Sequence, residues 1–288
     1  MPFAEVLSDE PMSKHTTFKI GGPADFVIVS KNSDELTRVL RFLKEREITP
    51  MIIGNGSNLI ISDSGIRGVV VKNAGGDVKI SGKNITAESG AGLTKLAKMS
   101  FSSSLSGLEF AQGIPGSVGG AVFMNAGAYG GEISQVLVSS IYLDENLKLK
   151  TLEHEGHDFS YRHSFFSENP ENIILSSTFT LEEGEKSEIE EKVRGLMTRR
   201  AGKQPLEFPS AGSIFKRPEG GYAAELIERC GLKGHTIGGA QVSEKHAGFI
   251  INTGGASADD VLRLIEHIQK EVLKKTGVAL ECEVRRIG

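Results

Sequence analysis

Glycine-dense segments give the first sign of chemistry in this sequence. One of them, residues 54–58 (Gly-Asn-Gly-Ser-Asn), lies between two short apolar runs. Its two glycines allow a tight turn that directs several main-chain N–H groups into one hollow, and such a nest binds pyrophosphate oxygens. Leucine at position 59, with no Gly-Lys-Ser/Thr after it, excludes the Rossmann fingerprint and the P-loop. A tight hairpin turn remains an equal alternative for this segment taken alone.

A second glycine-dense segment covers residues 107–131, with eight glycines in 25 residues. It is too apolar for a linker, which is usually hydrophilic and rich in serine. Main chain laid closely against a large flat ligand is the interpretation that we favour for residues 113–121. A packed contact between glycine-rich helices is the alternative.

Three polar side chains stand in settings that could serve catalysis. Arg162 lies in a segment with few other charges and could hold a carboxylate through a bidentate pair. Ser213 follows a glycine, but the Gly-x-Ser-x-Gly elbow of hydrolases is absent, so a turn is the default interpretation. A last strand is expected over residues 278–284, and its alternation places Glu283 opposite an apolar face, on a solvated edge or in a cleft.

Composition limits the classes of protein that fit. A chain of 288 residues has room for two domains, and a net charge of −4 without a basic stripe predicts no nucleic-acid partner. Cys230 and Cys282 have no metal-ligand spacing and are expected to be reduced. We find no stretch typical of a signal peptide or a membrane span, and we expect a cytoplasmic protein. The polar segment with His154 and His157 is expected to be a solvated surface, and no metal site is expected.

The glycine segments need regular elements to hold them. In the first half of the chain, strands are expected at residues 26–30, 51–53, 59–61, 68–72, 84–88, 136–143, 147–152 and 173–181. Helices are expected from the capping-box pattern at 32–35 and over residues 90–102, with a hairpin turn at 144–146.

The C-terminal part of the chain reads as a separate unit after a linker near residues 182–186. Helices are expected at 187–201, about 222–230 and 258–274, with a strand at 249–252. Ser257 and Asp260 form a plausible capping pair for the last helix. Its buried stripe is expected to be Val261, Leu264, Ile265, Ile268 and Val272.

Seven segments become specific when they are taken in order: residues 15–24, 54–59, 113–131, 161–164, 211–216, 238–246 and 280–285. Together they resemble the MurB family, the reductases that make UDP-N-acetylmuramate. The resemblance implies an α+β fold with a PCMH/vanillyl-alcohol-oxidase-type FAD-binding region of two subdomains, residues 1–184, split near residue 72. It also implies a C-terminal α+β substrate domain, residues 185–288, whose last strand returns to the active site.

The same resemblance implies the ligands. FAD would bind non-covalently, with its pyrophosphate near residues 54–58 and its isoalloxazine near 113–121, and NADPH would donate hydride. The matching cofactor-binding residues are Gly54, Asn55, Gly56, Ser57, Asn58, Leu59, Ile114, Pro115, Gly116, Ser117, Gly119, Gly120, Ala121 and Asn125. The substrate would be a UDP-sugar enolpyruvyl ether held by Tyr161, Lys203 and Lys216.

Catalytic roles also follow from the resemblance. Hydride addition builds negative charge on the enolpyruvyl carboxylate, and Arg162, aided by Glu283, would steady it. One preorganised donor of this kind contributes about 3–4 kcal/mol. Ser213 matches the family's proton donor to C2, which suits a weak acid only if the carbon is strongly basic and within hydrogen-bonding reach.

Two features of the chain depart from the pattern of some family members. The stretch between Tyr161 and Lys203 is short, which resembles the members without a tyrosine-bearing loop over the substrate, and Arg217 stands where some members have asparagine. Another FAD-dependent oxidoreductase of the same fold, or a non-catalytic sugar-nucleotide binding module, could keep the glycine segments. We expect an NADPH-dependent reductase of peptidoglycan precursor synthesis, acting as a monomer on a small-molecule substrate, without nucleic-acid or membrane partners.

Overall fold

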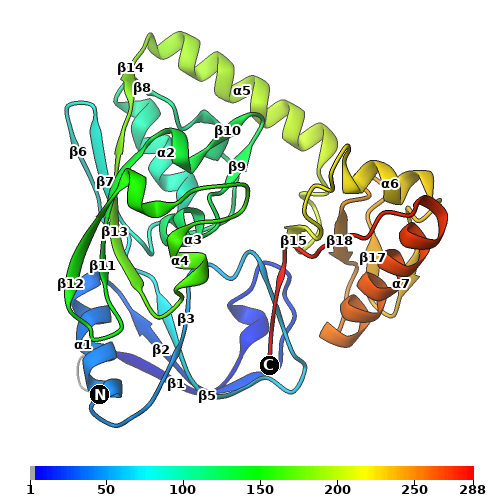
Figure 1. The fold of residues 1–288 in the computed structure, drawn as a ribbon, viewed down its shortest axis with the longest axis horizontal. Coiled ribbons are helices and arrows are strands. Elements are labelled where there is room, and N and C mark those ends of the chain that lie inside the picture. The colour runs from blue at the N-terminus through cyan, green and yellow to red at the C-terminus, as the bar shows by residue number, and fades with distance from the viewer. Residues whose placement is uncertain (1–3) are drawn as a thin grey trace. The chain divides into compact units, whose positions relative to one another are not determined.

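The computed structural model describes residues 4–288, in which helices and β-sheets alternate along the chain (Figure 1). The chain divides into two compact units. The first unit comprises the described residues up to Leu7, then Val27–Asn55 and Val69–Thr198; the second comprises Ser8–Phe26, Gly56–Gly68 and Arg199–Gly288. These units interleave, because two N-terminal segments pack with the C-terminal residues. The continuous division at residue 184 therefore stays a prediction about domains.

A five-stranded antiparallel sheet forms much of the first unit. Its strand order is β12 (Leu149–Glu153), β11 (Leu137–Leu143), β13 (Ile173–Thr180), β7 (Asn84–Glu88) and β6 (Val78–Ser81). The expected turn is confirmed between β11 and β12, where the Leu147 N–H donates to the Asp144 carbonyl at 2.7 Å. The predicted strands of this region are confirmed within two residues at their ends.

A second sheet has the order β1 (Glu5–Pro11), β2 (Pro23–Ser30), β5 (Ile66–Asn73) and β3 (Met51–Ile53). Helix α1 (Ser33–Lys44) follows β2. The predicted helix start is confirmed, since the Asn32 side chain accepts from the Glu35 N–H. The reciprocal bond of a capping box is not formed, because the Glu35 carboxylate accepts from the Lys31 N–H, one residue before the cap. The buried face of α1 packs in a cluster with Ile28 and Val71.

Short helices carry the glycine-rich part of the first unit. They are α2 (Leu93–Ser102), η2 (Glu109–Ala111), α3 (Val118–Phe123), η3 (Ile133–Gln135), η4 (His154–His157) and α4 (Phe165–Glu168), with the strand pairs β9 (Gly127–Ala128) with β10 (Gly131–Glu132) and β8 (Leu105–Ser106) with β14 (Glu182–Glu183). Helix α2 starts later than predicted, because an added Cβ at Gly90 would lie 2.6 Å from the main chain of Gly75. Helix α3 was not predicted. Burial of its Val118 and Val122 in the core outweighs the low helix propensity of its two glycines.

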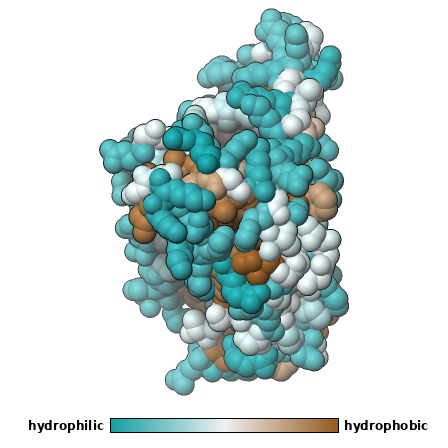
Figure 2. All heavy atoms as spheres, turned by 90° about the vertical axis from the view of Figure 1, so that its right-hand side faces the viewer, coloured by the Kyte–Doolittle hydropathy of each residue, from teal (hydrophilic) through white to brown (hydrophobic). Residues whose placement is uncertain are grey.

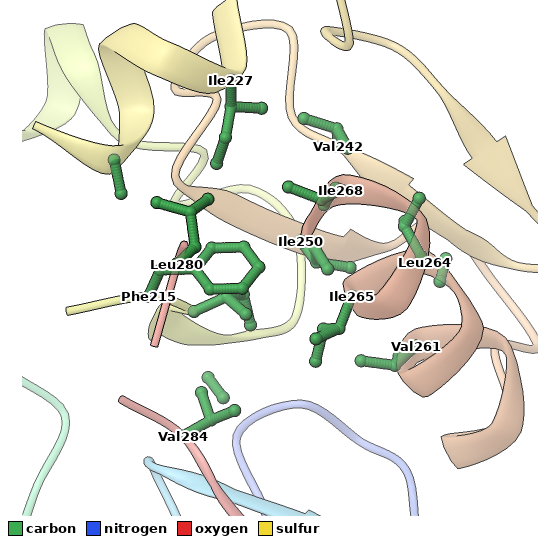
Figure 3. Close-up of a cluster of buried hydrophobic side chains, with 14 of the residues drawn as sticks. Phe215, Ile227, Val242, Ile250, Val261, Leu264, Ile265, Ile268, Leu280 and Val284 are labelled. Atoms are coloured by element: carbon green, nitrogen blue, oxygen red, sulfur yellow. The ribbon is translucent and has the colours of Figure 1, made fainter. Parts of the chain in front are cut away.

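The second unit is built on a small sheet with the order β15 (Ser210–Ser213), β18 (Phe249–Asn252), β17 (Ala240–Val242) and β16 (Thr236–Ile237). It also contains η1 (Met12–Lys14), α6 (Ala223–Arg229) and α7 (Ala258–Thr276), and α5 (Lys186–Lys203) ends in it. The predicted stripe of α7 is confirmed: it packs against Phe215, Ile227, Val242 and Ile250 (Figure 3). Ser257 caps α7, accepting from the Asp260 N–H at 3.0 Å.

The predicted last strand is wrong in its position. Strand β19 covers only Arg285–Ile287 and pairs in parallel with β4 (Leu59–Ile61). Residues 278–284 form no strand: Cys282 makes only an isolated antiparallel bridge with Phe215, through the Lys216 N–H to the Glu281 carbonyl at 2.9 Å and the Glu283 N–H to the Ile214 carbonyl at 2.8 Å. The alternation of burial still holds, since Leu280 and Val284 are buried and Glu281 is exposed.

The face of the molecule in Figure 2 is mostly hydrophilic, with apolar side chains in smaller areas. No helix within residues 4–288 combines the length and the apolarity that crossing a membrane requires. Both cysteines are free, Cys230 buried and Cys282 half-buried. In the described part of the chain, no three His, Cys, Asp or Glu side chains are grouped to hold a metal ion.

His157 corrects the expectation of a solvated surface. Its side chain is fully buried, its Nδ1 lies 2.9 Å from the Glu153 carbonyl, and its Nε2 lies 2.9 Å from the Ser140 hydroxyl. The imidazole stacks on Phe159 with ring centroids 5.0 Å apart. Burial lowers the pKa of His157, so the neutral ring is part of the core of the first unit.

We expect the free energy of unfolding to fall as pH drops from 7.5 to 5.5, and His157→Gln to reduce that fall. The pKa of His157 is lowered in the folded state, whereas the unfolded chain titrates near about 6.5. The unfolded state then takes up the proton first. This contribution to stability is therefore present above about pH 6.5 and is lost as the pH falls below it. Urea unfolding of both proteins across the pH range measures the difference.

His163→Gln is a control that should change the pH dependence of stability in the opposite direction. Burial opposes protonation of His163, but the Asp158 carbonyl and the Glu168 carboxylate outweigh it and raise its pKa. The stabilisation by His163 is present below its ordinary pKa and is lost as the pH rises through its raised pKa in the folded state. Removing His163 should therefore make the free energy of unfolding fall more steeply at low pH. Identical slopes for His157→Gln and the wild type would contradict the assignment.

Candidate functional site

The first-unit half of the 54–58 loop lies against the second glycine segment. The side-chain amide of Asn55 donates to the Pro115 carbonyl at 3.0 Å. A Cβ added at Gly54 would lie 2.2 Å from the Ser117 hydroxyl oxygen, so a larger residue there would have to displace the Ser117 side chain. The two segments that the sequence singled out therefore meet within one unit, through Gly54, Asn55, Pro115 and Ser117.

The second-unit half of the loop is held by main chain as well. Gly56 has φ +62°, and an added Cβ would lie 2.2 Å from the His15 carbonyl oxygen. The Thr17 N–H donates to the Gly56 carbonyl at 3.4 Å. Across the described residues, the N–H groups of positions 55–58 donate no hydrogen bond within the chain. Four consecutive main-chain donors are thus available to an anion.

The 113–121 segment combines internal packing with exposed backbone. Gly119 packs on Ser89, since its added Cβ would lie 2.8 Å from the Ser89 Cβ, and its N–H donates to the Ser89 carbonyl at 2.7 Å. This agrees with the packed-helix alternative at that one position. Pro115 and Gly120 are exposed, and Ile114 and Gly116 are half-buried. Internal packing therefore explains only part of the glycine content.

Gln112 was missed by the sequence reasoning. Its side-chain oxygen is buried and has no hydrogen-bond partner among the described residues. A buried acceptor left unpaired costs about 1–3 kcal/mol, so a bound donor beside it would be stabilising. No pattern in the sequence marks Gln112, because it is identified by the burial of its oxygen and not by its residue type.

Asn125 uses its side chain inside the protein. It is fully buried, its amide donates to the Ser160 carbonyl at 3.0 Å, and its oxygen accepts from the Ser134 N–H at 3.0 Å. These bonds fix Ser160, the residue before Tyr161 and Arg162. Asn125 thus supports the segment that carries the arginine.

Arg162 stands at the tip of a tight turn in the first unit. Ser160 and His163 pair across the turn, and Arg162 has φ +57°, an uncommon conformation for a residue with a side chain. Its guanidinium donates to the Gly127 carbonyl at 3.3 Å and lies 4.9 Å from the centre of the Tyr161 ring. Backbone strain of about 1–3 kcal/mol is kept where the surroundings enforce it, often at functional sites.

Ser213 and Glu283 come together in the second unit. Ser213 ends β15, and the next residue, Ile214, accepts at its carbonyl from the Glu283 N–H at 2.8 Å. The Asn58 amide donates to the Glu283 carbonyl at 3.1 Å. Ser213 and Glu283 are both half-buried. The residues that carry the hydroxyl and the carboxyl are thus linked through main chain, and the side chain of Asn58 links them to the end of the glycine loop.

The lysines of the second unit differ in their setting. Lys216 forms an ion pair with the exposed Glu281 at 2.5 Å. Lys203 is exposed at the C-terminal end of α5. Burial chiefly lowers the pKa of His246, and the charges of Lys233 and Lys203 act in the same direction. Lys203 therefore lies within electrostatic range of His246.

Family profiles match two parts of the chain. The profile of the UDP-N-acetylenolpyruvoylglucosamine reductase C-terminal domain matches residues 204–287, and a FAD-binding domain profile matches residues 24–146. A relative from Clostridium botulinum (strain Hall) called UDP-N-acetylenolpyruvoylglucosamine reductase is 53% identical over 98% of this chain and 92% of its own. One of the same name from Pediococcus pentosaceus is 48% identical over 100% of this chain and 96% of its own.

A solved structure agrees with these relatives. The crystal structure of the reductase (MurB) from Thermus caldophilus has a TM-score of 0.85 and 32% sequence identity. It covers 99% of both chains. With the FAD-binding profile, this match confirms the predicted fold class.

Gly54→Ala should lower the free energy of unfolding by about 1–3 kcal/mol, because the new methyl group overpacks the site. Its Cβ would stand 2.2 Å from the Ser117 hydroxyl oxygen. Adding Ser117→Ala should recover part of the loss, with a coupling energy of about 0.5–3 kcal/mol. Urea denaturation of the two single variants and the double variant measures this coupling.

Gly195→Ala is the matched control for that series. Gly195 lies in α5, and nothing lies within 4 Å of its added Cβ. Alanine favours the helix by about 1 kcal/mol, so this variant should be as stable as the wild type or more stable. Strictly additive losses for Gly54→Ala and Ser117→Ala would contradict the contact.

Proposed function

The chain belongs to the UDP-N-acetylenolpyruvoylglucosamine reductase family, and on this premise we propose which of its residues bind the flavin, hold the substrate and move the proton. The enzyme reduces the enolpyruvyl ether of UDP-N-acetylglucosamine to UDP-N-acetylmuramate for peptidoglycan synthesis, with NADPH as reductant and non-covalent FAD as mediator. The observation that carries the assignment of roles is that Glu283 is bonded both to Ile214, next to Ser213, and to the side-chain amide of Asn58.

Residues of both glycine segments fit FAD. The free N–H groups of positions 55–58 suit its pyrophosphate oxygens, and the exposed backbone of Pro115 and Gly120 suits a flat ring. The unpartnered oxygen of Gln112 suits an N–H group such as the ring edge offers. Bound FAD would supply hydride to C3 of the enolpyruvyl double bond. The proposed cofactor-binding set is completed by Gly54, Leu59, Ile114, Gly116, Ser117, Gly119, Ala121 and Asn125.

Arg162 is proposed to hold the carboxylate of the substrate. A guanidinium binds a carboxylate through two parallel hydrogen bonds, and it remains charged at any physiological pH. Negative charge grows on this carboxylate when C3 receives hydride, so the attraction is stronger in the transition state than in the ground state. What supports this role is the enforced turn at positions 160–163, which presents the side chain from a rigid base.

Ser213 is proposed to give its hydroxyl proton to C2, with Glu283 beside it assisting the charge. A serine hydroxyl is a weak acid, so the transfer requires a basic carbon within hydrogen-bonding reach. The half-burial of both side chains supports this pairing, because exclusion of water strengthens each electrostatic interaction.

Tyr161, Lys203 and Lys216 are proposed to contact the substrate, with the lysines facing its diphosphate. Lys216 would exchange its ion pair with the exposed Glu281 for a phosphate oxygen. The profile matches at 24–146 and 204–287 support a FAD-binding region over residues 1–184 and a substrate domain over 185–288. A monomeric state and a cytoplasmic location belong to the same proposal.

Two measurements test the activity. The purified protein, reconstituted with FAD if necessary, should absorb near about 450 nm, which a module that binds only sugar nucleotides would not do. NADPH consumption should depend on UDP-N-acetylglucosamine enolpyruvate. A flavoprotein that oxidises NADPH without responding to this substrate would favour a different oxidoreductase of the same fold.

Ser213→Ala should leave flavin reduction by NADPH within about twofold of the wild type and slow substrate reduction by about 10²–10⁴-fold, the usual share of acid–base catalysis. Anaerobic stopped-flow at 450 nm follows the two halves separately. Ser210→Ala on the same strand is the control and should be normal in both halves. Equal loss in both halves for Ser213→Ala would refute its role as proton donor.

A further inference from the structure

The N-terminal segment with Thr16 and Thr17 contacts two parts of the candidate site within the second unit. Its main chain lies against Gly56, where the Thr17 N–H donates to the Gly56 carbonyl at 3.4 Å. The Thr17 hydroxyl donates to the Ser210 carbonyl at 2.8 Å. One residue therefore connects the glycine loop with the first residue of β15, the strand that ends at Ser213.

Strand β15 needs such a connection because its own ladder is irregular. Ser210 pairs with Ile251 and Ser213 pairs with Phe249, so the register shifts between them. Gly212 inside this bulge has φ +76°. A bulge removes ladder hydrogen bonds and redirects the side chain that follows it. The direction of the Ser213 hydroxyl thus depends on anchors outside the ladder.

Just before the bulge, the Pro209 carbonyl accepts from the Asn252 N–H at 2.9 Å, and three further bonds of the described residues hold the strand on either side of it. Thr17 holds its beginning at Ser210. Beyond its end, the Ile214 N–H donates to the Gly248 carbonyl at 2.9 Å, and the Ile214 carbonyl accepts from Glu283. Of these anchors, only the Thr17 bond comes from a side chain and also leads to the glycine loop.

We infer that Thr17 is a positioning residue for Ser213: its hydroxyl sets the start of the bulged strand and ties it to the loop of residues 56–58. This inference rests on the proposed role of Ser213. Thr17 does not touch the reacting atoms. Its effect should therefore be confined to the step in which the Ser213 proton is used.

The test uses the FAD-loaded full-length enzyme. Thr17→Val keeps the shape of the side chain and removes its donor, while Thr17→Ser keeps the donor. Thr17→Val should slow substrate reduction by about five- to tenfold, the factor that one neutral hydrogen bond represents, and leave flavin reduction by NADPH within twofold. Thr17→Ser should restore the rate to within about threefold of the wild type.

Thr16→Val is the matched control for loss of a hydroxyl in this segment. The Thr16 hydroxyl donates to the Ile20 carbonyl at 3.0 Å, a bond that stays inside the segment. Both halves of the reaction should remain within about twofold of the wild type, since this bond does not reach β15. Melting temperature and the flavin absorbance, measured on every variant, identify a general loss of structure.

A double variant separates positioning from stability. If Thr17 acts through Ser213, Thr17→Val should add nothing to Ser213→Ala in the substrate half-reaction. Additive losses, or a Thr17→Val effect on both halves alike, would overturn the inference and leave the role of Ser213 in place. If Ser213→Ala itself left substrate reduction unchanged, the proposed function of Ser213 would fail and the inference with it.

Discussion

Direct contact of main chain with main chain is the constraint on which the candidate site depends. At Gly56, which has φ +62°, an added Cβ would stand 2.2 Å from the His15 carbonyl oxygen, so a hydrogen atom is all that the packing admits. This closeness lets the Gly56 carbonyl accept from Thr17, and the Asn58 carbonyl accept from the Arg285 N–H at 3.0 Å. The loop is thus held through its carbonyl groups and its asparagine side chains, while its main-chain N–H groups at 55–58 donate to no group in the described part of the chain.

Each of the two units places a polar side chain of the candidate site on irregular backbone. In the first, Arg162 stands on a turn with φ +57°, supported by the buried amide of Asn125. In the second, Ser213 ends a bulged strand. Neither residue lies in a regular ladder, where side chains must alternate between two faces. Irregular backbone allows a direction that a strand would forbid, and its cost of about 1–3 kcal/mol is offset by the surrounding core.

Sequence patterns predicted the elements whose local signals agree with their packing. Helix α7 has its cap at Ser257 and a continuous apolar stripe, and β3, β4, β7 and β18 have the expected bounds. Patterns failed where distant contacts decide. Helix α3 forms despite its glycines because Val118 is buried, and His157 is buried because η4 folds its polar segment over an aromatic cluster. The same holds for the candidate site. The glycine loops were predicted because they form a pattern in the sequence. Thr17 was missed because its partner, Ser210, lies far along the chain, and Gln112 was missed because its signal is a buried oxygen without a partner among the described residues.

The actual position of the last strand explains why Glu281 and Glu283 differ in exposure. A ladder over residues 278–284 would have put Glu281 and Glu283 on one face in equivalent surroundings. Instead, pairing at residues 278–284 is limited to one bridge between Cys282 and Phe215, and only Arg285–Ile287 joins β4. Glu281 is left exposed and paired with Lys216, while Glu283 is half-buried and its main chain is fixed by Ile214 and Asn58. Two carboxylic acids two residues apart thus differ in exposure, which is the asymmetry that the proposed chemistry requires.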